Sequence, residues 1–233
     1  MKKIRYLTII VILCSNAQSS FAQNTERDDL GAWYMYVFTA KFKDSRFGVQ
    51  GDIQYRNWNL LGDTEQFLLR AGATYNPEGT NVTLTLGVSN FTNVILGEDD
   101  STFNENRVYQ EVLMPQKVGI RFYFVHRFRY EQRFVENQDF TTRIRYKLSL
   151  NIPLNKKELV KNAVYIAFYN EVFINGERDI GNGGQVPIFD QNRFYSGIGY
   201  GITDKIKMQL GYMNQSTEVF SKNQLQFSIH HNF

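Results

Sequence analysis

The sequence predicts an all-β protein, a single antiparallel, up-and-down transmembrane β-barrel of about 10–12 strands. Three observations carry this prediction. The first residues have the pattern of an export signal, and apolar and polar residues alternate along most of the remaining chain. The alternating segments are also longer than the strands of ordinary globular proteins. Together they favour a barrel of the outer membrane of a Gram-negative-type cell.

The N-terminal residues predict a signal peptide. Three basic residues precede an apolar run over residues 7–13, and small residues at positions 20 and 22 mark a cleavage site before Gln23. The apolar run is too short to cross a bilayer as a helix. We therefore expect a signal peptide over residues 1–22 and an outer-membrane barrel domain over residues 23–233. A lipoprotein anchor at Cys14 is disfavoured, because the large Leu13 precedes it.

Composition excludes several classes of protein once the signal is removed. Of the 26 lysines and arginines, three lie in residues 1–22, so the remaining 23 equal the 23 acidic residues. Without a basic excess, no nucleic-acid partner is expected. The single cysteine also leaves with the signal, and the three histidines lack the spacing of metal ligands. We expect neither a cofactor nor a metal.

A period of two in hydropathy defines the candidate strands, because successive side chains of a strand point to opposite faces. Most segments are 11 to 14 residues long. Strands that cross a membrane need roughly 9–11 residues, whereas globular strands average about 5–6. The candidate strands are 31–42, 46–58, 64–75, 81–91, 103–114, 118–134, 139–152, 162–174, 190–202, 205–215 and 223–233.

The connectors alternate in length, as they do in outer-membrane barrels. Longer loops at 59–63, 92–102, 135–138, 175–189 and 216–222 share one side. Short turns at 43–45, 76–80, 115–117 and 203–204 share the other, with 153–161 as a longer exception. Eleven segments conflict with the usual even number of strands. We therefore expect either one missed strand or a misread first segment, and favour twelve strands over ten.

The last strand ends in an aromatic residue. Phe233 follows apolar residues at alternate positions, Leu225, Phe227 and Ile229, although His231 departs from the pattern. This pattern resembles the C-terminal signal that the barrel-assembly machinery reads during insertion. An edge strand of a soluble sheet could also end this way, but strand length and alternation favour the signal. The expected partners are outer-membrane lipid and the barrel-assembly machinery.

Several aromatic and basic segments resemble one bacterial family. They are Gly31-Ala32-Trp33-Tyr34-Met35-Tyr36, Gln54-Tyr55-Arg56-Asn57-Trp58, Arg107-Val108-Tyr109-Gln110-Glu111, His126-Arg127-Phe128-Arg129-Tyr130-Glu131-Gln132-Arg133-Phe134 and Asn192-Arg193-Phe194-Tyr195. The family is catalogued as domain of unknown function 2490 and is grouped with outer-membrane β-barrels. The resemblance implies the barrel architecture and carries no catalytic or binding residue over.

A row of charges runs along three consecutive strands. The charged face of strand 118–134 and its neighbours carries Arg107, Glu111, Arg121, Arg127, Arg129, Glu131, Arg133, Arg143, Arg145 and Lys147. A charge facing lipid near the bilayer midplane costs about 2–4 kcal/mol, so these side chains are predicted to face the lumen. Glu171 and Asp52 could supply further counter-charges. Two interpretations stay open: an ion-pair network that fills the interior, or a lining for an anionic solute or ligand.

The most plausible function is a non-enzymatic small pore or a structural or surface-interaction barrel. The alternative is an outer-membrane hydrolase or acyl-modifying enzyme that acts on phospholipid or lipid A. Such an enzyme needs a nucleophile, a histidine and an orienting polar group. Ser228 and His230 share the inner face of the last strand, but no acid can be assigned to them, so we predict no catalytic residue.

Three further sites are predicted from position alone. His126 falls on the apolar face of its strand, which suggests a β-bulge that reverses the alternation. Trp33, Trp58, Tyr75, Tyr146 and Phe233 lie near predicted strand ends, as an interfacial aromatic girdle would. Asp99-Asp100, Glu177 and Asp179 could hold Ca²⁺ in external loops, but the ordinary interpretation is solvated loop charge.

Overall fold

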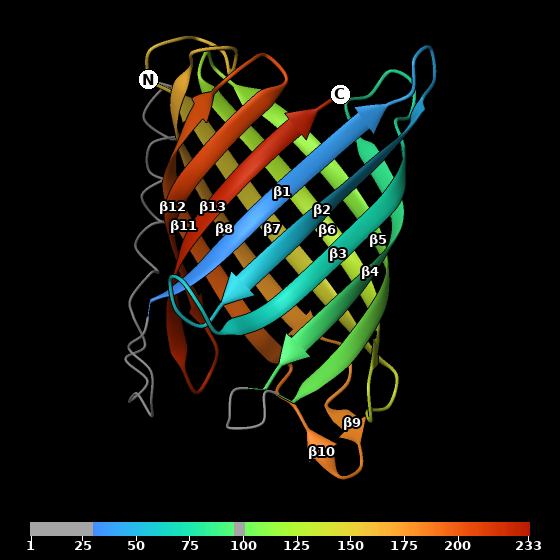
Figure 1. Ribbon diagram of the computed structural model, residues 1–233. Helices are drawn as coiled ribbons and strands as arrows, with labels where there is room; N and C mark the ends of the chain where they lie inside the picture. Colours follow the sequence, from blue (N-terminus) through green and yellow to red (C-terminus); the bar gives the residue numbers. More distant parts are fainter. Residues whose placement is uncertain (1–29, 96–100) are drawn as a thin grey trace, which may run out of the picture.

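The computed structural model describes residues 30–95 and 101–233, and these residues form a closed β-barrel (Figure 1). Among them, no helix is long and apolar enough to cross a membrane. The barrel strands are β1 (Gly31–Lys41), β2 (Phe47–Asn57), β3 (Thr64–Tyr75), β4 (Thr83–Val94), β5 (Thr102–Val118), β6 (Phe122–Val135), β7 (Thr141–Pro153), β8 (Val164–Asn175), β11 (Phe189–Gly201), β12 (Ile206–Ser216) and β13 (Ser221–Asn232). A separate hairpin of β9 (Asp179–Gly181) and β10 (Gly184–Gln185) lies in the loop between β8 and β11.

The barrel has two different ends. The connectors at 42–46, 76–82, 119–121, 154–163 and 202–205 form one end, named here the short-turn rim. The connectors at 58–63, 136–140, 176–188 and 217–220 form the loop rim, from which β9 and β10 project (Figure 1). The predicted division of the connectors between two ends is confirmed, but the difference in length rests mainly on 176–188, since 154–163 is longer than the other three loop-rim connectors named.

The barrel closes with a parallel pair. β1 and β13 lie side by side and run in the same direction, with Trp33 opposite Gln226 (Figure 1). All the other neighbouring barrel strands are antiparallel. The prediction of a closed all-β barrel is confirmed, but the preference for twelve strands is wrong: the barrel has eleven. An odd number leaves the start of β1 at the loop rim and the end of β13 at the short-turn rim.

One predicted turn lies inside a strand. Residues 115–117 belong to β5, and the reversal occurs at 119–121, where Gly119 has a φ of 60°. Pro115 is tolerated because β4 pairs with β5 only as far as Leu113. The carbonyl of Pro115 accepts a hydrogen bond from Asn81 Nδ2 (2.6 Å). Because the nitrogen and the carbonyl of one strand residue point to the same side, the Pro115 nitrogen also points to this side, beyond the end of the β4 ladder.

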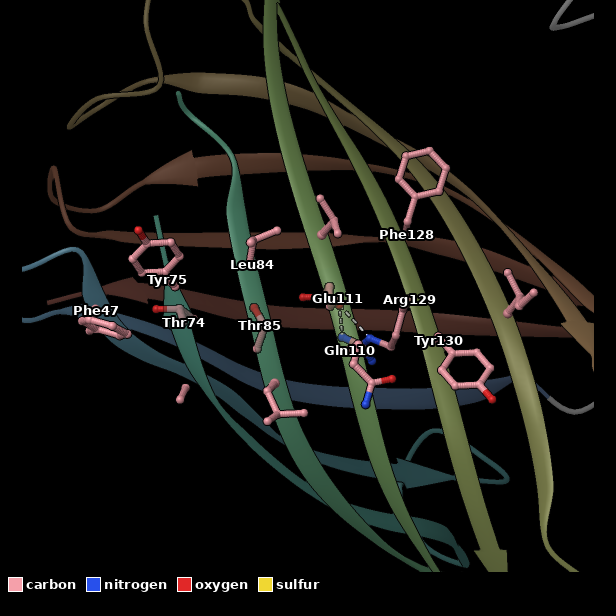
Figure 2. Close-up of a pocket in the computed structure, with 14 residues that line it drawn as sticks. Phe47, Thr74, Tyr75, Leu84, Thr85, Gln110, Glu111, Phe128, Arg129 and Tyr130 are labelled. Carbon is pink, nitrogen blue, oxygen red and sulfur yellow. Dashed lines mark hydrogen bonds and ion pairs between the residues drawn. The ribbon is translucent and has the colours of Figure 1, made fainter. Parts of the chain in front are cut away.

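The outer face of the barrel is apolar and the inner face is polar. Figure 2 shows this on β5 and β6: Arg129 bonds to Glu111 inside the barrel, whereas its neighbours Phe128 and Tyr130 are exposed on the outside. Large apolar residues are exposed on strands around the barrel, including Ile53, Leu69, Leu86, Val88, Ile144, Ile198 and Leu210. This arrangement is the inverse of a soluble protein, in which apolar residues gather inside.

Glycines on the inner face make room for flat tyrosine rings. A Cβ atom on Gly199 would lie 2.1 Å from the Tyr165 ring, and one on Gly197 would lie 2.3 Å from the Tyr195 hydroxyl oxygen. Both tyrosines are fully buried. The rings therefore lie flat against the wall of the barrel, where they pack with Trp33, Ala167 and Met213.

Some predictions concern residues outside the described ranges. These are the signal peptide over residues 1–22 with Cys14, and the carboxylates Asp99 and Asp100. They stay predictions.

Candidate functional site: the barrel lumen

The lumen holds a cavity of about 680 Å³ whose walls are strongly basic. Eleven arginines and lysines line it, against four carboxylates. Glu131, which is buried in the wall behind them, adds a fifth carboxylate. Cations therefore exceed anions by about two to one in the lumen.

Glu131 is the centre of the ion-pair network. Its carboxylate accepts bonds from Arg143 Nη2 (2.8 Å) and Arg145 Nη1 (2.6 Å), and Arg107 Nη1 lies 3.3 Å away. A fourth arginine, Arg129, lies at 3.7 Å. The residue is 1% exposed, so these charges neutralise one another with little help from water.

Two more carboxylates extend the network toward the short-turn rim. Glu111 accepts a bond from Arg129 Nε (2.7 Å). Glu171 accepts bonds from Arg127 Nη2 (2.5 Å) and Arg145 Nε (2.8 Å). The residues predicted to face the lumen on β5, β6 and β7 thus converge, and Glu171 joins them from β8.

Other ion pairs complete the network toward the loop rim and across the lumen. Glu105 accepts bonds from Arg107 Nε and Arg133 Nε, both at 2.6 Å. On the opposite wall, Arg70 Nε donates to Asp52 (2.7 Å). Sequence reasoning missed Glu105 and Arg70, although the alternation along β5 and β3 places both on the inner face.

Arg121 does not belong to the network, in contrast to the prediction. It lies in the turn between β5 and β6 and is exposed. Its Nη1 donates to the carbonyls of Pro153 (3.2 Å) and Leu154 (2.7 Å). The prediction failed because the predicted strand began at residue 118 and so included the turn at 119–121. Lys147 does face the lumen, but its ammonium group lies over the Tyr169 ring, 4.0 Å from the centroid, rather than against a carboxylate.

A stack of rings and guanidinium groups crosses the lumen. Trp33 lies between two arginines in this stack, with Arg56 Cζ 3.8 Å and Arg193 Cζ 4.8 Å from its ring centroid. Arg193 also lies over Phe173 (4.6 Å), and Arg145 lies over the same ring (4.3 Å). The stack joins β2 to the ion-pair network, and each contact combines apolar area with cation–π attraction.

Two members of the predicted aromatic girdle lie elsewhere. Trp33 is 4% exposed and points into the lumen, so it is not an interfacial residue. Tyr146 lies in the middle of β7, with its hydroxyl 2.8 Å from His126 Nδ1. His126 is on the outer face in regular register with Leu148, so the predicted bulge is absent and the tyrosine hydroxyl supplies a partner for the imidazole.

On β1, β7 and β13, exposure of the inner face increases toward the short-turn rim, whereas Ala167 and Tyr165 on β8 and Gly199 on β11 stay buried. Along β7, Arg143 and Arg145 are buried, whereas Lys147 and Ser149 are half-buried. The same gradient holds on β1, from buried Trp33 to exposed Thr39. It also holds on β13, from buried Gln224 and Gln226 through half-buried His230 to exposed Asn232. On these three strands the lumen is therefore more accessible from the short-turn rim, and this part of it is named here the vestibule; the stack and the network narrow the lumen toward the loop rim.

The comparison with protein families identifies the chain. The family model described as "Protein of unknown function (DUF2490)" matches residues 30–226, from just before β1 into β13. The chain belongs to the DUF2490 family. The resemblance predicted from the sequence is thereby confirmed. No curated protein and no solved structure matches the chain.

The DUF2490 barrel brings Ser228 and His230 together on β13. Ser228 Oγ lies 3.0 Å from His230 Nε2. Within the described ranges, no carboxylate bonds to the other nitrogen of the ring, so the third member of a triad is missing. The described residues also contain no group of three or more potential metal ligands. Of the loop carboxylates, Glu177 accepts bonds from the Thr142 amide and hydroxyl, and Asp179 accepts one from the Gly181 amide.

The outer wall of the DUF2490 barrel carries an apolar depression of about 690 Å³ (Figure 2). Tyr75, Leu84, Phe128 and Tyr130 line it, and Gln110 is the polar residue of the outer face among them. The Glu111–Arg129 pair lies on the other side of the same wall. The depression therefore belongs to the outer surface and does not open into the basic lumen.

Proposed function

We propose that the chain is a non-enzymatic outer-membrane β-barrel, exported by a signal peptide, whose lumen is closed toward the outside. The observation that carries this proposal is the inverted distribution of residues, with apolar side chains exposed outside and ion pairs buried inside. Apolar surface of this extent on a soluble protein would lead to association, whereas in a bilayer it is solvated by lipid.

Asparagine pairs support a membrane boundary near the loop rim. On the outer face, Asn90 Nδ2 donates to Asn106 (2.9 Å), and Asn214 Nδ2 donates to Asn223 (2.8 Å). Each pair lies near the loop end of its strands. Below these pairs, toward the short-turn rim, the outer face is mainly apolar. The pairs therefore fit the height at which the lipid tails would meet the headgroups.

The connectors and the last residue favour one orientation. Outer-membrane barrels have short periplasmic turns and longer external loops, so we assign the short-turn rim to the periplasm. Phe233 lies at that rim, where its amide donates to the Thr39 carbonyl (2.9 Å). Leu225, Phe227 and Ile229 oppose outer-face residues of β12. This strand end is suited to recognition by a barrel-assembly machinery in the periplasm.

The closed lumen favours a structural or surface-interaction role over a diffusion pore. A pore needs an open path between the two rims, and the stack around Trp33 together with the Glu131 network narrows that path. The hydrolase alternative is not proposed, because the Ser228–His230 pair lies inside the lumen and has no orienting acid.

Fractionation and assembly test this proposal. The mature protein should start at Gln23, sediment with outer membranes, and migrate faster on a gel before heating than after it. Deletion of Phe233 should reduce the heat-modifiable form more than removal of the β9–β10 hairpin, because insertion is expected to read the last strand. A folded protein that stays in the soluble fraction, or equal assembly of the two deletion variants, would contradict the proposal.

A further inference from the structure

The surplus of positive charge in the lumen is concentrated on a few residues. Seven of the lining arginines form ion pairs with carboxylates. Across residues 30–95 and 101–233, four lining cations have no carboxylate within 4.0 Å: Arg56, Lys147, Arg193 and Lys207. An uncompensated cation in a confined interior is costly, so an anion bound there would stabilise the protein.

Three of these four cations have nitrogen atoms that donate to no acceptor in the described chain; one of them, Lys207, lies nearer the short-turn rim, and the other two lie deeper. Arg56 is not one of them, since it donates to Gln54 and Gln66. Arg193 uses its Nε on Gln215 (3.0 Å), and its two terminal nitrogens donate to no acceptor in the described chain. The Lys147 ammonium contacts only the face of the Tyr169 ring. A guanidinium fork and an ammonium group are therefore both available to a ligand.

These two residues lie in one row of the wall. Lys147 on β7 is opposite Glu171 on β8, and Glu171 is opposite Arg193 on β11. The Glu171 carboxylate is already bonded to Arg127 and Arg145, so it cannot neutralise both of its lateral neighbours. The row thus presents two cations around one occupied carboxylate, a net positive surface.

The row faces the cavity of the lumen. Lys147 and Arg193 are both half-buried and line it, and on the β7 side the inner face stays half-buried toward the short-turn rim, whereas Ala167 and Tyr165 on β8 are buried. Lys207 on β12, which lies opposite His230 on β13 near that rim, adds a further cation. A ligand that entered from the short-turn rim would therefore meet positive charge along its path through the vestibule.

We propose that the floor of the vestibule is a binding site for an oxyanion, a phosphate or carboxylate group, held by Arg193 and Lys147. The guanidinium fork of Arg193 matches the two oxygens of either group, and Lys147 adds a point charge. The cavity is larger than a single oxyanion, so a free ion or the anionic group of a larger molecule would fit. The site does not depend on the membrane location proposed above.

Trp33 provides a direct reporter of the site, because Arg193 stacks on its ring. The chain has two tryptophans, so Trp58→Phe leaves Trp33 as the sole tryptophan, whose emission can be excited selectively. The folded protein in a non-ionic detergent would be titrated with inorganic phosphate and with succinate at constant ionic strength, with chloride as the control ion. Equilibrium dialysis of radiolabelled phosphate would measure binding in every variant independently of fluorescence.

We expect phosphate, succinate or both to bind saturably, with chloride having no comparable effect. Arg193→Gln and Lys147→Gln should each weaken binding by about tenfold or more. Arg46→Gln is the matched control, because Arg46 pairs with Glu78 in the exposed short-turn rim; it should bind like the parent protein. The proposal is overturned if the folded parent binds neither anion, if chloride gives the same response, or if both lumen variants bind normally. Heat-modifiable migration of each variant separates loss of the site from loss of the barrel.

Discussion

Removing the Glu131 carboxylate should destabilise the barrel by about 3–5 kcal/mol, the usual cost of deleting one partner of a buried ion pair. The carboxylate lies within 4.0 Å of four arginines and is 2% exposed as a side chain. Glu131→Ala would leave these four positive charges in a confined interior. Each arginine retains one other carboxylate, such as Glu105 for Arg107 and Glu171 for Arg145, so the barrel should weaken rather than fail to form.

The free energy of unfolding would be measured by urea titration of protein refolded into phospholipid vesicles. Tryptophan emission and heat-modifiable migration would report the folded fraction. Glu78→Ala is the matched control, because the Arg46–Glu78 pair is exposed (side chains 50% and 77%). Its removal should cost under about 1 kcal/mol.

A second variant separates charge from packing. Adding Arg143→Met to Glu131→Ala should recover part of the lost stability, because one fewer positive charge surrounds the position from which the carboxylate was removed. A loss under about 1 kcal/mol for Glu131→Ala would refute the reasoning, since it would mean that water screens the network and that the lumen is open.

Three further predictions follow from the closed lumen, the tyrosine rings and the parallel closure. In planar bilayers the parent protein should show no steady conductance. The double variant Trp33→Ala, Arg193→Ala should conduct and prefer anions, because the remaining lining is net positive. Conductance of the parent protein would contradict the proposed closed lumen. Gly199→Val should destabilise the folded barrel by about 1–3 kcal/mol, because the new side chain overlaps the buried Tyr165 ring, and Tyr165→Ala should relieve the effect in urea titrations. An epitope inserted ahead of Leu30 should bind antibody on intact cells, since β1 begins at the loop rim, whereas an epitope after Phe233 should require permeabilised cells.

Alternation in the sequence was sufficient to predict the faces of the strands. On β7, for example, Ile144 and Arg145 are adjacent, so they point to opposite faces. The structure places Arg145 in the lumen and Ile144 outside. This works because a strand has a side-chain period of two and each face has one environment. The ion pairs between neighbouring strands follow from the same rule, since sequential strands are joined by short connectors.

Features that depend on closure could not be read from the sequence. The alternation of residues along each strand does not show that β1 pairs with β13 in parallel. An even number was expected because single-chain bacterial barrels usually have one. The stack of Arg56, Trp33 and Arg193 joins strands from both ends of the chain, so no local pattern predicts it. Pro115 was misread because its turn preference is local, whereas its position beyond the end of the β4 ladder is a property of the sheet.

In a bilayer, the outer face of the barrel should contact lipid and the inner face should not. The chain has one cysteine, Cys14, within the expected signal peptide, so single cysteines in the mature chain can be labelled selectively. Spin labels at positions 207 to 212 of β12 would be tested in vesicles for collision with oxygen and with a water-soluble nickel complex. We expect a period of two, with high oxygen accessibility at positions 208, 210 and 212 and low values at 207, 209 and 211. Uniform accessibility to the nickel complex, or no alternation, would contradict it.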